Sequence, residues 1–106
     1  MLLDRDRLIA NEFQQRLKSF LPILDFRVFG SRARGDAEAD SDLDIFIEVE
    51  TITPKQRQRI SEVAWEVGFE MDRVISPIVA TRDRLENGPI GANPLILQIE
   101  REGVRP

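Results

Sequence analysis

The sequence predicts a small α/β protein of the α+β class, with elements in the order helix, strand, strand, helix, strand, helix. Apolar residues recur at helical spacing over residues 4–21 and 53–68, and short runs rich in β-branched and aromatic residues lie between and after these segments. A chain of 106 residues has room for one core, so we expect a single domain over residues 1–106.

The first helix is expected over residues 4–21, and Pro22 ends it. Its buried face should consist of the apolar residues Ile9, Phe13, Leu17, Phe20 and Leu21. A first strand follows over residues 24–29 and closes at Gly30. A second strand is expected over residues 43–49, where apolar residues alternate with polar ones.

The second long helix should begin with Thr53 as its N-cap and Pro54 at its first helical position, and Gly68 should end it. A third strand is expected over residues 74–80, and Pro77 restricts it to a sheet edge or a bulge. A glycine-containing loop then leads to a last helix over residues 94–102.

The composition excludes several kinds of chemistry. The chain has no Cys and no His, so disulfides, zinc sites built on thiolate or imidazole, and Ser-His-Asp catalysis are all excluded. Its apolar runs are too short for a membrane span, and its first residues lack the pattern of a signal peptide, so we expect a cytoplasmic protein. The net charge of −4 argues against direct nucleic-acid binding.

The candidate site begins with Gly30 and Ser31, which precede Asp42 and Asp44 by ten intervening residues. Residues i and i+2 of a strand share a face, so the two carboxylates should point the same way while apolar neighbours fill the other face. Paired carboxylates of this kind can bracket magnesium ions roughly 3.5–4 Å apart. The competing interpretation is a solvated acidic loop, because residues 36–50 hold seven acids and no base.

The turn before the carboxylates suits a phosphate. Gly30 permits close approach, and Ser31 offers a hydroxyl and a backbone N–H at the start of a short helix. Arg32 and Arg34 could reach phosphate oxygens, although simple solvent exposure is an alternative for each of them.

Two other phosphate or metal motifs are rejected. Gly35 completes a Gly-x-x-x-x-Gly spacing, but Asp36 and Ala37 follow where a P-loop requires Lys and Ser or Thr. An EF-hand beginning in the acidic run would place Ile45 at the required glycine and Thr51 at the bidentate Glu.

Gly30-Ser31, ten residues and Asp42-x-Asp44 resemble the signature of the DNA polymerase beta-type nucleotidyltransferase superfamily, and the stretch GSRARGDAEADSDLDIFIEV resembles its minimal nucleotidyltransferase (MNT) family. The resemblance implies a mixed sheet covered by helices mainly on one face. It also implies transfer of AMP from ATP to a hydroxyl, with Gly30 and Ser31 holding the triphosphate and Asp42 and Asp44 holding Mg²⁺, two ions in all.

The family pattern has a third carboxylate on a later strand, where it binds the catalytic metal and can accept the proton of the attacking hydroxyl. Asp72 is the candidate for this third catalytic and metal-binding residue. The alternative is an ordinary residue at a strand start, since the interior of that strand offers Ser76 but no acid. In that case the enzyme would be slow, would recruit Glu48, or would be a relic that only binds.

The resemblance also implies a partner. MNT proteins are often paired with HEPN-domain RNase toxins, so we expect an antitoxin that adenylylates a toxin hydroxyl, typically that of tyrosine. Two alternatives are a non-catalytic antitoxin that retains the fold and a small-molecule nucleotidyltransferase of the aminoglycoside type. The chain contains no Tyr, so the acceptor tyrosine must come from elsewhere. Phe13, Phe20 and Trp65 fit either partner anchors or core positions.

Overall fold

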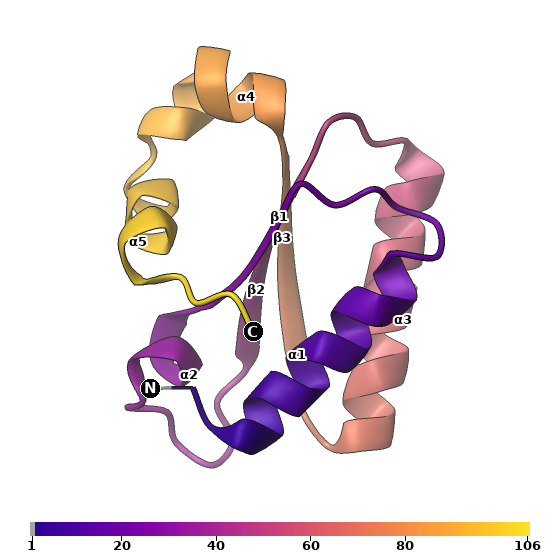
Figure 1. Cartoon of the computed structure of the whole chain (residues 1–106), viewed down its shortest axis with the longest axis vertical. Coiled ribbons are helices and arrows are strands. Elements are labelled where there is room, and N and C mark those ends of the chain that lie inside the picture. The colour runs from indigo at the N-terminus through magenta and orange to yellow at the C-terminus, as the bar shows by residue number, and fades with distance from the viewer. Residues whose placement is uncertain (1) are drawn as a thin grey trace.

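The computed structural model describes residues 2–106. Its elements in chain order are α1 (Asp4–Leu17), β1 (Asp25–Phe29), α2 (Gly30–Arg34), β2 (Leu43–Val49), α3 (Pro54–Met71), β3 (Ile75–Thr81), α4 (Arg82–Asn87), the 3₁₀ helix η1 (Pro89–Ala92) and α5 (Pro94–Glu102). The sheet stands between two groups of helices, with α1 and α3 on one side and α4 and α5 on the other (Figure 1).

The three strands form a mixed sheet in the order β1-β2-β3. Strands β1 and β2 are antiparallel, and Phe29 pairs with Asp44 in their register. Strands β2 and β3 are parallel, and Asp44 pairs with Ser76. Pro77 therefore lies in an edge strand, as predicted, where its missing N–H interrupts no inner ladder.

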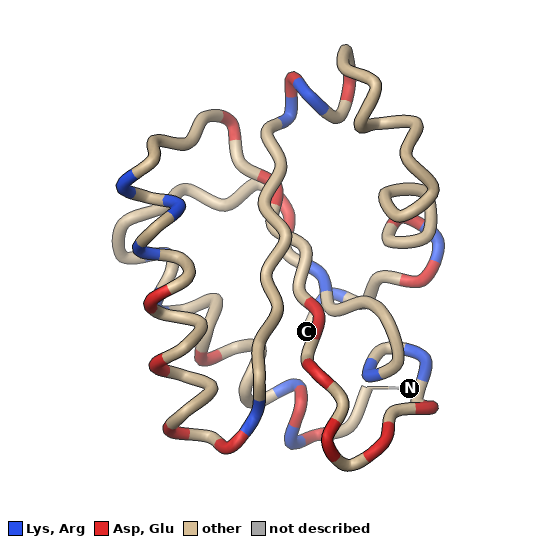
Figure 2. Tube along the Cα trace, turned by 180° about the vertical axis from the view of Figure 1, so that it is seen from behind, with Lys and Arg blue, Asp and Glu red and all other residues tan. Residues whose placement is uncertain are grey.

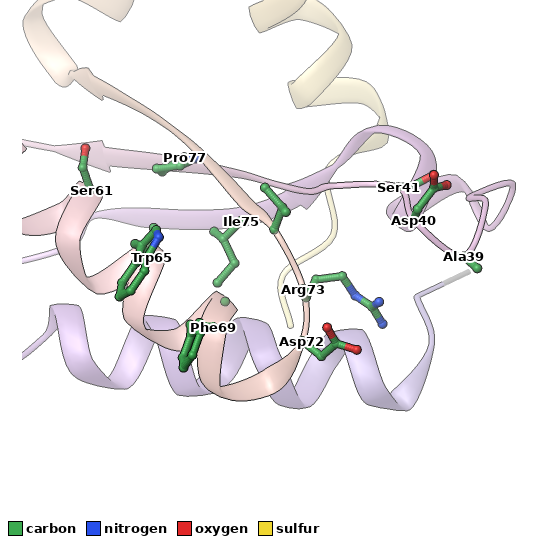
Figure 3. A pocket seen from close by; sticks show the side chains of 13 residues that line it. Ala39, Asp40, Ser41, Ser61, Trp65, Phe69, Asp72, Arg73, Ile75 and Pro77 are labelled. Carbon is green, nitrogen blue, oxygen red and sulfur yellow. The ribbon is translucent and has the colours of Figure 1, made fainter.

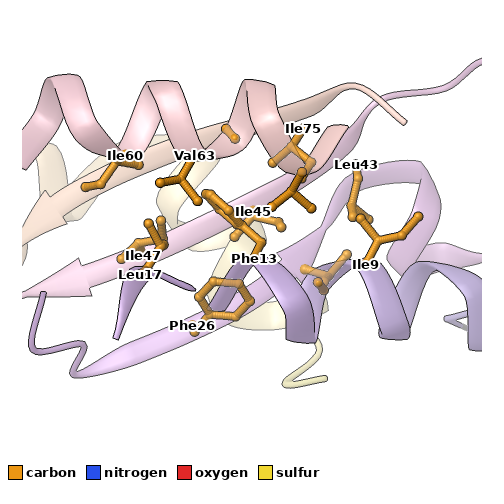
Figure 4. Packing of buried hydrophobic residues seen from close by; sticks show 14 of the residues in the cluster. Ile9, Phe13, Leu17, Phe26, Leu43, Ile45, Ile47, Ile60, Val63 and Ile75 are labelled. Atoms are coloured by element: carbon orange, nitrogen blue, oxygen red, sulfur yellow. The ribbon is translucent and has the colours of Figure 1, made fainter. Parts of the chain in front are cut away.

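The larger part of the core lies between the sheet and the two long helices α1 and α3 (Figure 4). Ile9, Phe13 and Leu17 of α1 are fully buried there, and the ring of Phe13 lies 6.1 Å from that of Phe26. A smaller cluster occupies the opposite face, beneath α5; it consists of Phe29, Phe46, Ala80, Ile96 and Ile99. The predicted mixed sheet is confirmed; helices lie on both of its faces, and the larger core is on the face of α1 and α3. The Asp44 side chain points away from the larger core, to the same face of β2 as Phe46.

Helix α3 starts as predicted but ends later. Thr53 and Gln56 form a capping box, in which the Thr53 hydroxyl accepts from the Gln56 N–H at 3.1 Å. Gly68 was expected to end this helix, but α3 continues to Met71. Gly68 instead permits a close crossing, because a Cβ there would lie 2.3 Å from the backbone oxygen of Arg73.

Two other boundaries differ from the prediction. Helix α1 ends at Leu17, and Phe20 and Leu21 follow in a turn, although both N–H groups still bond to the Leu17 carbonyl oxygen. The segment expected as a loop after β3 contains α4 and η1. The Thr81 side chain caps the start of α4, where it accepts a hydrogen bond from the Arg84 N–H. Among residues 2–106, no helix combines the length and apolar character needed to cross a membrane.

Candidate active site

The Gly30 turn lies directly against the carboxylate of Asp44. Gly30 follows β1, has φ of +75°, and would place a Cβ 2.6 Å from Asp44 Oδ2. The pairing of Phe29 with Asp44 across the sheet brings the turn to this position. Glycine is therefore required twice, by its backbone conformation and by the space that the carboxylate takes. The structure thus brings the two halves of the sequence motif together.

Asp42 and Asp44 lie at the start of β2, with Asp42 exposed and Asp44 half-buried. The hydroxyl of Ser76, on β3, donates to Asp42 Oδ2 at 3.1 Å. Burial raises the pKa of Asp44, the negative charge of Asp42 raises it further, and Arg34 opposes both. A divalent cation would offset the repulsion between these two carboxylates. The pair therefore suits a hard metal ion that prefers oxygen ligands.

Arg34 lies at the end of α2, on the exposed side of the turn. Its guanidinium pairs with Asp36 and with Glu102 of α5, each at 3.3 Å, and the hydrogen bonds to these two residues raise its pKa. Exposed pairs of this kind contribute little stability and exchange readily. Figure 2 shows the acidic positions of the loop before β2 running up to the sheet, with the basic positions of α2 beside them. The Arg34 side chain can therefore leave Asp36 and Glu102 and bind a phosphate at a small cost in free energy.

Arg32 was expected to face phosphate, but the structure buries it. Its Nε and Nη2 donate to the Ser41 carbonyl oxygen at 3.2 and 2.9 Å, and Nη2 also donates to the Ala39 carbonyl oxygen at 3.1 Å. Its Nη1 lies 3.5 Å from Asp6 Oδ2. The guanidinium is thus committed to the chain's own loop and to a buried carboxylate, which leaves Arg34 as the arginine open to a ligand.

Sequence reasoning missed Asp6. Its side chain is fully buried on α1, and a signal was present, because Asp6 lies three residues before Ile9 on the apolar stripe of that helix. An acid on such a stripe requires a buried partner, and Arg32 and Arg73 supply it.

Asp72 is not brought to the carboxylate pair. It is the exposed C-cap of α3, in a left-handed conformation with φ of 56°. It lines a hollow of about 800 Å³ together with Trp65 and Phe69, which stack at 5.4 Å and project from α3 (Figure 3). Ile75 lines the same hollow, on the face of β3 opposite Ser76.

Glu48, the acid considered in place of Asp72, does not join Asp42 and Asp44 either. Over residues 2–106, no group of three or more acids, His or Cys is arranged to hold a metal ion. The β3 position in register with Asp44 is Ser76. Glu48, the other candidate, is bound instead by Arg82 at 2.8 Å. The site therefore offers two carboxylates and a hydroxyl.

The chain is similar to known proteins in sequence and in fold. A family model of the nucleotidyltransferase domain matches residues 8–104. The chain belongs to this family. A search of the curated proteins found no match. Gly30, Ser31, Asp42 and Asp44 all lie within the matched range.

Solved structures share the nucleotidyltransferase fold. One assigned as a minimal nucleotidyltransferase is 24% identical, with a TM-score of 0.67 over all of this chain and 97% of that one. A nucleotidyltransferase of Sulfolobus solfataricus is 26% identical, with a TM-score of 0.53 over 76% of this chain and 70% of that one. A toxin-antitoxin crystal structure with AMP-PNP is 19% identical, with a TM-score of 0.61 over 96% of this chain and 71% of that one.

Proposed function

We propose that this protein is a magnesium-dependent nucleotidyltransferase that transfers AMP from ATP to a tyrosine hydroxyl of a HEPN-type RNase toxin, and that it acts in the cytoplasm as the antitoxin. The observation that carries the proposal is the contact between the Gly30 turn and Asp44, where a Cβ would fall 2.6 Å from the carboxylate. A phosphate-binding turn placed against a carboxylate pair suits a metal-bound triphosphate better than either feature would alone.

The proposed roles follow from where each group lies. Asp42 and Asp44 would hold Mg²⁺, which neutralises phosphate charge and favours departure of pyrophosphate. The backbone of Gly30 and the hydroxyl of Ser31 would position the triphosphate, with Arg34 reaching its oxygens from the exposed side. The acceptor oxygen forms a bond to the α-phosphorus, the bond from that phosphorus to the β-phosphate bridging oxygen breaks, and pyrophosphate leaves.

The acceptor hydroxyl must also lose its proton as its oxygen bonds to the α-phosphorus. In the resembled family a third carboxylate can accept it, but here β3 places Ser76, and not an acid, in register with Asp44. We propose that the proton passes to solvent water, which reaches the exposed Asp42. A site of this kind should be slower than one with a third carboxylate, because general-base catalysis typically contributes at least about 100-fold.

The acceptor must come from another molecule, because the chain has no Tyr. The toxin-antitoxin structure with AMP-PNP shares this fold and supports an acceptor of that kind. Ser76 also favours a second candidate function, a non-catalytic antitoxin that binds its partner without modifying it, since the site lacks the third acid. The two candidates make opposite predictions about covalent modification.

Intact-mass spectrometry of the partner protein distinguishes them. After incubation with this protein and Mg-ATP, we expect the partner to gain one or more AMP units, and Asp42→Ala combined with Asp44→Ala to abolish the gain. Asp72→Asn is the matched control, because it changes an acid outside the pair and should retain the modification. A partner that is bound and inhibited but keeps its original mass would support the non-catalytic antitoxin instead.

A further inference from the structure

Asp6 is a fully buried charge that the proposed reaction does not use. Its Oδ1 accepts a hydrogen bond from Nε of Arg73 at 3.2 Å and lies 3.1 Å from Nη2 of the same guanidinium. Its Oδ2 is buried and, within residues 2–106, receives no hydrogen bond, although Nη1 of Arg32 lies 3.5 Å away. A carboxylate shielded from water in this way requires cationic neighbours, so α1 is joined electrostatically to the turn that carries Arg32.

Arg32 connects the two halves of the site. It directly follows Ser31 of the phosphate turn, and it donates to the carbonyl oxygen of Ser41, which directly precedes Asp42. Across residues 35–42 the other hydrogen bonds are local, such as that from the Glu38 N–H to the Ser41 hydroxyl at 2.8 Å, except that the Ser76 hydroxyl donates to Asp42 Oδ2 at 3.1 Å. One planar guanidinium with several fixed donors thus sets the spacing between the turn and the carboxylate.

We propose that Arg32 and Asp6 are positioning residues for the metal site. Asp6 holds the guanidinium in place, the guanidinium holds the Ala39 and Ser41 carbonyl oxygens, and the loop then presents Asp42 beside Asp44. Stability alone does not explain such a network, because well-packed apolar residues often replace buried ion pairs without loss. The inference rests on the proposed function, which places a divalent cation at Asp42 and Asp44.

Binding of Mn²⁺ alone, followed by electron paramagnetic resonance of the free ion, tests the proposal without any turnover. Arg32→Met should weaken Mn²⁺ binding by about tenfold or more, the range seen when residues that orient metal ligands are lost. Arg32→Lys keeps the charge but cannot reach the same carbonyl oxygens together, so it should also weaken binding. Arg59→Met is the matched control, because it removes an arginine whose ion pairs, among residues 2–106, are those with Glu62 and Glu66 on the surface of α3.

A double variant separates positioning from folding. Asp6→Asn with Arg32→Met removes both charges, so its melting temperature should exceed that of Asp6→Asn alone, which leaves the Arg32 guanidinium buried without its carboxylate, while its Mn²⁺ affinity should stay low. Circular dichroism establishes that each variant is folded at the temperature of the titration. Wild-type affinity in a folded Arg32→Met, Arg32→Lys or double variant would overturn the positioning role. Failure of the wild-type protein itself to bind Mn²⁺ would instead count against the proposed function.

Discussion

The hydroxyl of Ser76 donates a hydrogen bond of 3.1 Å to Asp42 Oδ2, at a position where β3 lies in register with Asp44. Strand β3 thus places a serine, and no acid, beside the two carboxylates. Ser76→Asp would supply a third acid, so we expect transfer to become faster by about 100-fold or more, the size of general-base effects. Initial rates of AMP transfer measure this, with Ser76→Ala as the control that adds no acid. A slower Ser76→Asp variant would show that the site does not use a third carboxylate.

Gly30→Ala should abolish nucleotidyl transfer, because a methyl group at this position would displace the Asp44 carboxylate. Gly35→Ala is the matched control. Gly35 also has a positive φ, of 87°, so both variants bear a similar backbone penalty of about 1 kcal/mol or more. Urea unfolding should show comparable losses of stability, whereas only Gly30→Ala should lose activity. Equal activity in the two variants would mean that the contact with Asp44 does not matter.

The metal-free protein should lose stability as pH rises through the pKa of Asp44. Burial and then Asp42 raise this pKa, so the folded state holds the proton more tightly than the unfolded state. The stabilisation is complete below the ordinary value of 3.8 and is lost as pH climbs above the raised pKa. Thermal unfolding of wild type and Asp44→Asn in EDTA, across acidic to neutral pH, measures this contribution.

At neutral pH the Asp44→Asn variant should therefore melt at a higher temperature than wild type when no metal is present. Added Mg²⁺ should raise the melting temperature of wild type, because the ion binds only the folded state. It should leave Asp44→Asn nearly unchanged. An equal response of the two proteins to Mg²⁺ would place the metal elsewhere.

Asp72→Asn should keep both metal binding and transfer at wild-type levels. Asparagine tolerates the left-handed conformation of this C-cap, so the substitution removes the charge without straining the backbone. Asp42→Asn makes the same chemical change at the proposed site and should lose transfer by at least about 100-fold. Mn²⁺ titration and initial rates of both variants measure the difference. A loss in Asp72→Asn as large as that in Asp42→Asn would restore Asp72 to the catalytic set.

Strand periodicity was sufficient to predict the carboxylate pair. The alternation of acids and apolar residues over residues 42–49 sets the face of Asp44, and the structure agrees. The N-cap at Thr53, and a sheet edge or a bulge at Pro77, were likewise predicted, because each depends on a local backbone rule. Such features require no knowledge of distant contacts.

The remaining features depend on tertiary contacts. Asp72 was expected at the start of β3, but α3 extends past Gly68, whose missing side chain lets the chain cross at Arg73. Arg32 was expected at the surface, and only the packing of α1 against the loop shows that Asp6 draws it inward. Trp65 fitted a core position by spacing, yet it is 70% exposed. Local periodicity alone could not determine any of these placements.

Transfer of the α-phosphate label tests the central claim most directly. The partner protein would be incubated with this protein, Mg²⁺ and ATP labelled at either the α- or the γ-phosphorus. Nucleotidyl transfer predicts that the partner acquires the α-label and never the γ-label, and that Asp44→Asn abolishes the signal. A partner that acquires only the γ-label, or neither label while its RNase activity is still suppressed, would contradict the account.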